Sequence, residues 1–290
     1  MLEAYAQALL NGLVLGLTYV AIAIGLTIVF GTLRLVNFAH GAFYAIGAYV
    51  GLVVAQQAGI VAGFVAAPIA VAIFAVLLDR VVLRYFYQRD ATSQILLTFG
   101  IALVVQETLR VIFGGTAQRY PVPAELATAV VLGSFAYPAY RLVFAFGVIV
   151  LIIAVWLFLE RTNYGLIVRA GIRDRVMVQL LGGNIRAAST VVFAFGAAIA
   201  GLVGAAASPI YSVEPTTGFD FLVPSFVVVV VGGLGSFWGA VLGGILIGEL
   251  QSLTTVVFAP AANVVIYLCM ALVLIFRPQG LLGESEVIKQ

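Results

Sequence analysis

Charged residues are scarce in this sequence. Only 9% of its 290 residues are Asp, Glu, Lys or Arg, whereas 63% are hydrophobic and the mean hydropathy is +1.18. A soluble domain carries about 25% charged residues, so this chain has too few polar groups to cover a soluble surface. The composition therefore excludes an ordinary soluble protein and predicts an integral membrane protein.

Several chemistries are excluded because the residues they need are rare. The chain has one histidine, His40, one cysteine, Cys269, and one lysine, Lys289. These are too few for a zinc site, and the sequence has no G-x-x-x-x-G-K-[ST] loop that could cradle the phosphates of ATP. We therefore expect a chain that is not an enzyme by itself and that binds no metal or other cofactor.

What the sequence has instead is a series of long apolar runs. Eight runs are candidate membrane-spanning helices, because about 20 apolar residues cross a bilayer as a helix. They cover residues 9–30, 38–56, 60–83, 95–113, 142–159, 188–207, 221–250 and 264–276. We predict an all-α integral membrane protein with about eight transmembrane helices in a single domain over residues 1–290.

The distribution of arginines predicts how these helices are oriented. Residues 80–94 contain three arginines and residues 160–187 contain five, whereas residues 209–220 contain Glu214, Asp220 and no basic residue. Because Lys and Arg concentrate in cytoplasmic loops, we expect the first two segments inside and the third outside. This places the N-terminus outside a bacterial cytoplasmic membrane. Arg277 and Lys289 favour a C-terminus inside, which requires residues 221–250 to return to the outer face.

Residues 221–250 are long for one span and contain a glycine-rich break. The run is about 30 residues, half as long again as one span needs, and Gly232, Gly233 and Gly235 lie near its middle. We predict a broken or re-entrant pair of helices, and the three glycines are candidates for a solute pathway, since non-helical backbone at membrane depth must face protein or a water-filled cavity. One long, kinked helix is the alternative.

Other polar and small residues carry weaker signals. Glu107 and Arg110 lie three residues apart on one helix face, and we favour a local ion pair over a proton relay. The scarcity of carboxylates near the midplane argues against ion coupling. Glycines four residues apart, such as Gly12 and Gly16, predict closely packed helices.

Residues 165–189 form the longest predicted cytoplasmic loop, and part of it has the pattern of an amphipathic helix. Apolar side chains share one face of a helix predicted over 173–181: Ile172, Val176 and Leu180, with Met177 and Leu181 beside them. Gly182 is a suitable C-cap. Such a helix can lie in the membrane interface as an anchor or sit in a groove of a partner protein, and the pattern leaves both open.

The same loop carries a family resemblance. It contains the pattern RA…D…LLG and is followed by an Ala- and Gly-rich span, FAFGAAIAGLVGAAASPIY. This arrangement resembles the EAA loop of ABC importer permeases, and most closely that of the LivH-type permeases for branched-chain amino acids. Residues 16–49, 227–244 and 276–284 resemble the same family. The sequence AGIRDR at 170–175 is more basic than the acidic start typical of the family.

The resemblance implies a transport subunit that works with other chains. It implies a second, LivM-like permease, two cytoplasmic ABC ATPase subunits that use ATP and Mg, and a periplasmic substrate-binding protein. Residues 160–187 would be the loop that couples to the ATPases, through Arg169, Arg173, Asp174, Val176, Met177, Leu180, Leu181 and Gly182. Substrates of the family include branched-chain amino acids, amides and urea, and organic acids, and nothing in this sequence distinguishes among them.

A polar cluster interrupts the apolar runs near residue 40. Asn37 is placed to cap the following helix, His40 falls in its first turn, and Tyr44 lies four residues further on the same face. One interpretation is a polar helix start with a hydrogen-bonded histidine. The other is that Asn37, His40 and Tyr44 line the cytoplasmic end of the solute pathway or its gate, where neutral donors release a zwitterion more readily than fixed charges do.

Together these features predict a function. We expect the permease subunit of an ABC importer that moves branched-chain amino acids or related small polar solutes by alternating access, with ATP hydrolysis in partner chains. A stand-alone ion-coupled carrier or a channel for small solutes is the alternative. A non-transporting membrane scaffold fits the composition but leaves the broken glycine-rich segment without a role.

Overall fold

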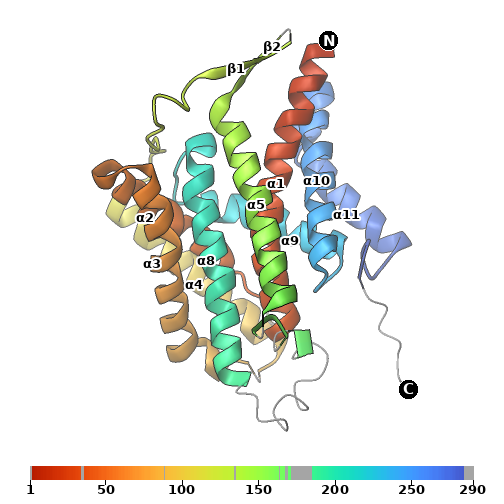
Figure 1. Ribbon diagram of the computed structural model, residues 1–290. Coiled ribbons are helices and arrows are strands. Elements are labelled where there is room, and N and C mark those ends of the chain that lie inside the picture. Colours follow the sequence, from red (N-terminus) through yellow and green to blue (C-terminus); the bar gives the residue numbers. More distant parts are fainter. Residues whose placement is uncertain are drawn as a thin grey trace.

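The computed structural model describes residues 2–33, 36–87, 89–133, 135–162, 164–166, 169–170 and 185–283, and these are predominantly helical (Figure 1). The long helices are α1 (Leu2–Leu33), α2 (His40–Ala58), α3 (Ile60–Val81), α4 (Ala91–Phe113), α5 (Ala139–Arg161), α8 (Ile185–Tyr211) and α10 (Phe237–Phe258). Each of these seven includes a stretch long and apolar enough to cross a membrane, and α9 (Thr217–Gly232) and α11 (Val264–Phe276) are shorter apolar helices. The predicted all-α membrane fold is confirmed.

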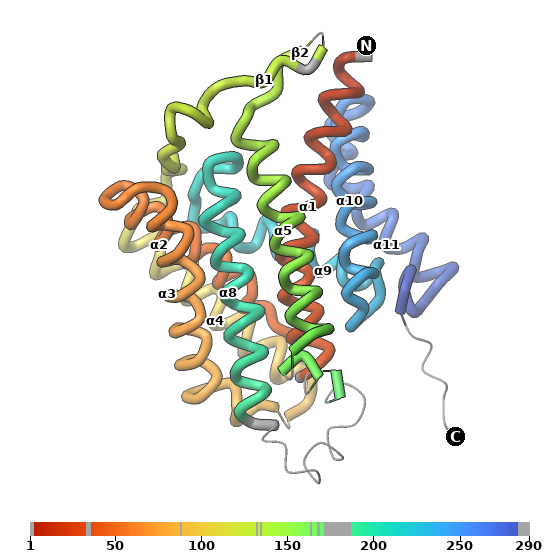
Figure 2. The backbone as a smooth tube through the Cα atoms, viewed as in Figure 1, coloured from red at the N-terminus to blue at the C-terminus, as the bar shows by residue number. Residues whose placement is uncertain are grey.

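The remaining regular structure is small. Two 3-10 turns, η1 (Leu83–Tyr85) and η2 (Ala259–Ala261), follow α3 and α10, and β1 (Ala129–Leu132) pairs antiparallel with β2 (Phe135–Pro138). Figure 2 shows this hairpin and the N-terminus at one end of the bundle, here called the hairpin end. The end of α5 and the beginning of α8 lie at the opposite end, here called the loop end.

Helix α1 forms the centre of the bundle and packs closely against α10. A Cβ on Gly248 would lie 2.3 Å from Cα of Gly16, and a Cβ on Gly16 would lie 2.8 Å from the carbonyl oxygen of Gly244. Side chains are excluded from this contact, so the two backbones touch. The close helix packing predicted from the spaced glycines is confirmed, and in this contact glycines of the two helices face each other.

Two helices begin inside the bundle, and they meet there. Helix α2 starts beside α1 and α8, where a Cβ on Gly25 would lie 2.8 Å from Nε2 of His40 and 2.8 Å from the carbonyl oxygen of Gly196. Helix α9 starts against the first turn of α2, where Gly218 meets Gly41. The connection from α8 to α9 is only residues 212–216, so the predicted outer loop over 209–220 is largely helical.

The outward faces of α3, α4 and α5 are apolar and exposed. Ile69 of α3 is 54% exposed, and Val104 of α4 and Ile153 of α5 are similarly uncovered. In the most apolar 18-residue stretch of each of these helices, only 17% to 28% is buried, whereas 83% is buried in the corresponding stretch of α1. Because such surface is stable only in an apolar medium, these helices form the lipid-facing or partner-facing side of the bundle.

Candidate functional site

The predicted polar cluster lies inside the bundle. Asn37 is 3% exposed and His40 is fully buried. Asn37 Oδ1 accepts a hydrogen bond from the Ala39 amide at 3.1 Å, and its carbonyl oxygen accepts from the His40 amide at 3.3 Å. The N-cap of α2 is Ala39, which makes no side-chain cap bond. The expected capping by Asn37 is therefore wrong, because its side chain orders the turn one step before the helix.

His40 and Tyr44 share one face of α2 and reach different surroundings. The His40 ring lies near the carbonyl of Ile22, but neither ring nitrogen makes a hydrogen bond of normal geometry to a described residue. The Tyr44 hydroxyl, on a side chain 1% exposed, also has no hydrogen-bond partner among the described residues. Burying these groups without hydrogen bonds costs free energy. This favours a role in which they gain partners in another conformation or from a bound solute.

Aromatic rings surround the start of α9. The ring centroid of Phe221 lies 5.1 Å from that of Tyr44, 4.9 Å from that of Tyr211 and 6.1 Å from that of Tyr19. On the other side of the same turn, the centroids of Phe219 and Phe99 are 5.7 Å apart. Four elements thus contribute rings to the region where α9 begins.

The glycine-rich break separates α9 from α10. Gly233 and Gly235 have φ of 107° and 83°, values that favour glycine. A Cβ on Gly233 would also lie 2.5 Å from the amide nitrogen of Gly283, while Leu282 donates a hydrogen bond to the Gly232 carbonyl at 3.0 Å. The predicted interruption of the helix is observed. Its described contacts include the segment after α11 and, through Gly232 and Gly239, the start of α10, so the break is a packed junction in this conformation.

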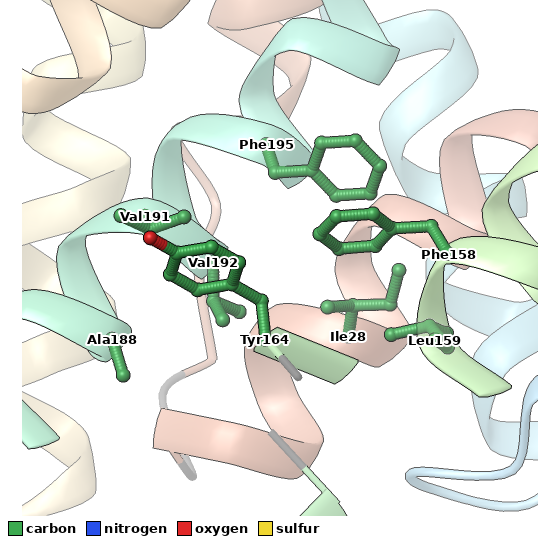
Figure 3. Close-up of a pocket in the computed structure, with 8 residues that line it drawn as sticks. All are labelled: Ile28, Phe158, Leu159, Tyr164, Ala188, Val191, Val192 and Phe195. Carbon is green, nitrogen blue, oxygen red and sulfur yellow. The ribbon is translucent and has the colours of Figure 1, made fainter. Parts of the chain in front are cut away.

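Two hollows in the bundle are unsuited to a polar solute. A groove of about 700 Å³ runs between α3 and α4 and is lined by apolar side chains with one hydroxyl, Thr108, which donates to the Val104 carbonyl. At the loop end a space of only about 10 Å³ lies among apolar residues of α1, α5 and α8 and Tyr164 (Figure 3). That space holds about one water molecule, so it binds no substrate.

The small apolar space marks where the predicted coupling loop leaves the bundle. The rings of Phe158 and Phe195 lie 4.7 Å apart, and Figure 3 shows Tyr164 beside Val191 and Val192 of α8. Among the proposed ATPase-coupling residues, Arg169 pairs with the Glu160 carboxylate and donates to the Glu160 carbonyl at 3.3 Å. The others lie outside the described residues: Arg173, Asp174, Val176, Met177, Leu180, Leu181 and Gly182.

A buried carboxylate at the loop end was missed by the sequence reasoning. Asp79, near the end of α3, is 3% exposed and accepts hydrogen bonds from the Tyr87 hydroxyl and, at 2.5 Å, from the Thr190 hydroxyl. It thus ties α3 to the start of α8, the helix that follows the coupling loop. An acidic residue within the apolar run of α3, beside Arg80, was the available signal.

Two further predictions concern ionisable groups. Glu107 and Arg110 form the expected ion pair, with 3.4 Å between Oε2 and Nη1, and both are well exposed at the hairpin end of α4. No group of three or more His, Cys, Asp or Glu side chains that could hold a metal ion occurs among the described residues.

Comparisons with known proteins cover nearly the whole chain. The family profile described as "Branched-chain amino acid transport system / permease component" matches residues 8–274. The permease BraD of Pseudomonas aeruginosa is 32% identical over 98% of both chains. LivH of Salmonella typhimurium is 29% identical over 98% of this chain and 97% of its own. LivM of Escherichia coli is 28% identical over 94% of this chain and 69% of its own.

A solved structure, PsaBC from Streptococcus pneumoniae in complex with Fab, aligns over 95% of both chains with 13% identity and a TM-score of 0.49, too distant a likeness to support an argument. The profile match and the full-length similarity to BraD are independent of that alignment. The chain belongs to the family of permease components of branched-chain amino acid transport systems.

Proposed function

We propose that this chain imports branched-chain amino acids or closely related small polar solutes, as one permease subunit of an ATP-driven complex in the bacterial inner membrane. The observation that supports this most is the similarity to BraD and LivH over 98% of the chain. The structure is consistent with such a transporter, because the bundle has apolar outer faces and unpaired polar groups in its core.

The family resemblance implies the other components of the complex. This chain has no phosphate-binding loop, so ATP with Mg would bind to two partner ATPase subunits. A second, LivM-like permease would complete the pathway, and a periplasmic binding protein would deliver the solute. In this arrangement the chain has no catalytic residue. The N-terminus and the β hairpin would face the periplasm, and residues 160–187 and the C-terminus the cytoplasm.

The proposed mechanism is alternating access. Movement of residues 160–187 by the ATPases would reach the bundle at the contact of Phe158 with Phe195 and at the Asp79–Thr190 hydrogen bond. Both contacts involve α8, which packs on α2 through Gly204 and Tyr44. Helix α8 therefore offers a direct mechanical connection from the loop end to the polar core, where Asn37, His40 and Tyr44 would gate the solute.

Co-purification tests the subunit assignment. The chain is purified from its native host in mild detergent, with mass spectrometry of the accompanying proteins. A variant with Val176→Asp and Leu180→Asp places two charges on the proposed docking face, and a matched variant with Ser189→Ala changes α8 without adding charge.

The proposal expects a second permease and ATPase subunits with the parent chain and with Ser189→Ala, and loss of the ATPases from the double variant. Reconstitution with the binding protein should then give ATP-dependent uptake of leucine. A chain that purifies alone and moves solute in liposomes without ATPases would overturn it in favour of a carrier or channel.

A further inference from the structure

Asp220 is an exposed carboxylate in the first turn of α9. It stands between Phe219 and Phe221, both of which pack against rings of other membrane helices. The described residues form two salt bridges, Arg110 with Glu107 and Arg169 with Glu160, and Asp220 belongs to neither. Its side-chain partner is the Thr216 hydroxyl, one turn earlier in the chain.

The neighbours of Asp220 place it well within the thickness of the bundle. Phe221 packs against Tyr19, and Asn11, which binds the Tyr137 hydroxyl at the hairpin end, lies about 12 Å further along the axis of α1 at 1.5 Å per residue. The hydrocarbon core of a bilayer is about 30 Å thick. Figure 1 shows α9 at mid-height in the bundle.

An exposed carboxylate at this depth does not face lipid. Charged side chains inside a membrane point into the bundle or into a water-filled cavity, because their transfer to hydrocarbon costs several kcal/mol. A first-turn acidic residue also stabilises the N-terminus of its helix, which explains its position in α9 but not its exposure at mid-depth. The exposed side of the first turn of α9 therefore faces protein or water and not lipid, which is where a solute passage would run.

A second polar group lies on the neighbouring helix α2. The Tyr44 ring packs 5.1 Å from that of Phe221, the residue after Asp220, and the Tyr44 hydroxyl is buried and has no hydrogen-bond partner among the described residues. The Tyr44 hydroxyl is a donor without a described partner, and the Asp220 carboxylate, which already accepts from Thr216, can accept further hydrogen bonds. Phe221 and Tyr211 supply an apolar wall next to both. An α-amino acid carries an ammonium, a carboxylate and an apolar side chain on one carbon, which is the complement of these three features.

We propose that Asp220 binds the α-ammonium group of the transported amino acid in this passage, with the Tyr44 hydroxyl donating to its carboxylate. The proposal rests on the proposed function, because it requires an amino acid as the solute. A solute without an ammonium group, such as the 2-oxo acid that corresponds to leucine, lacks the contact with Asp220.

Cysteine accessibility tests whether Asp220 faces water. Cys269 is the only cysteine, so Cys269→Ala gives a background without thiols. On it, Asp220→Cys and, as the lipid-facing control, Ile69→Cys are treated in the assembled complex with a charged, membrane-impermeant methanethiosulfonate. We expect modification at position 220 at least tenfold faster than at position 69. Equal, slow modification at both positions would place Asp220 against lipid or protein and overturn the proposal.

Transport by the complete complex tests the role of the charge. Asp220→Asn keeps the shape and removes the charge, Asp220→Glu keeps the charge, and Glu107→Gln neutralises an exposed carboxylate outside the passage. With leucine-loaded binding protein, we expect Asp220→Asn to lower leucine uptake at least tenfold while ATP hydrolysis stays within twofold of the parent. Asp220→Glu should restore part of the uptake, and Glu107→Gln should leave it unchanged.

The outcomes separate this inference from the function on which it rests. If the parent complex does not take up leucine, the proposed function fails. If the parent transports leucine and Asp220→Asn transports it equally well, only the role of Asp220 fails. If Asp220→Asn lowers uptake and ATP hydrolysis together, with reduced assembly on size-exclusion chromatography, Asp220 has a structural role and the proposal is overturned.

Discussion

Gly41 and Gly218 are in mutual backbone contact at the point where α2 and α9 begin. A Cβ on Gly41 would lie 2.4 Å from the Gly218 carbonyl oxygen, and a Cβ on Gly218 would lie 2.4 Å from the Gly41 carbonyl oxygen. Each glycine is the second residue of its helix. The first turns of two helices that begin inside the bundle therefore cross without intervening side chains, and beside this crossing the Tyr44 ring packs against Phe221, the residue after Asp220.

Gly218→Ala should destabilise the protein. The added methyl meets the Gly41 backbone at 2.4 Å, so the crossing must open, and overpacking of this kind costs about 1–3 kcal/mol. Gly147→Ala in α5 is the matched control, because a Cβ there meets nothing within 4 Å and alanine is the better helix former by about 1 kcal/mol. Thermal unfolding of the purified permease should show a lower midpoint for Gly218→Ala alone. Equal midpoints would show that the crossing is loose.

Removal of the Asp79 carboxylate should weaken the loop end. Asp79→Ala loses two hydrogen bonds to a charged acceptor, each worth about 1.5–3 kcal/mol, so we expect a loss of about 3–6 kcal/mol. Asp79→Asn retains one acceptor oxygen and should lose less. Glu160→Ala removes a half-exposed partner of Arg169 and should cost at most about 1 kcal/mol. Thermal unfolding ranks the three, and a loss in Asp79→Ala no larger than in Glu160→Ala contradicts the prediction.

Tyr120 should make stability depend on alkaline pH. It lies in the segment after α4, is 5% exposed, and burial raises the pKa of its phenol from 10.0 to about 12. Because the folded state holds this proton more tightly than the unfolded state, the stability contributed is complete below pH 10 and is lost progressively between pH 10 and about pH 12.

Tyr120→Phe checks this contribution directly. Its hydroxyl has no hydrogen-bond partner among the described residues, so its removal should leave stability at pH 7 unchanged or slightly raised. Unfolding midpoints measured from pH 8 to pH 11.5 should fall less steeply for Tyr120→Phe than for the parent. Parallel curves would mean that another group dominates the alkaline loss.

Tyr44→Phe and His40→Ala test the proposed gate. Phenylalanine keeps the ring contact with Phe221 and removes only a hydroxyl without a partner, so the unfolding midpoint should not fall. Uptake by the assembled complex should nevertheless drop at least fivefold. His40→Ala should lower uptake and also stability, because the ring fills the space beside Gly25. Parental uptake by both variants would show that neither residue gates the solute.

Much of the architecture was predictable because hydropathy is a local property. The run predicted at 264–276 coincides with α11, and the run at 221–250 divides into α9 and α10 around the predicted glycines. The spaced glycines correctly predicted close packing, but they did not show that Gly16 of α1 would meet Gly248 of α10. The partner of a packing residue depends on which helices become adjacent.

The candidate site was less predictable, because its contacts also depend on which helices become adjacent. Sequence reasoning selected Asn37, His40 and Tyr44, which are buried together near the start of α2, but assigned Asn37 a capping role that Ala39 occupies. It treated Asp220 as part of an outer loop, because residues 209–220 contain acidic residues and no basic one. Only the packing of Phe219 and Phe221 against other helices reveals its depth.

The sequence by itself determined that the chain is a multi-span helical membrane protein without an ATP-binding loop, because apolar run length and residue absence are read directly along the chain. The tertiary structure decided which helices cross and where polar groups converge. Gly41 and Gly218 are far apart in sequence, and Asp79 and Thr190 likewise meet only after folding. Contacts of this kind depend on the relative rotation and depth of whole helices, which no local pattern specifies.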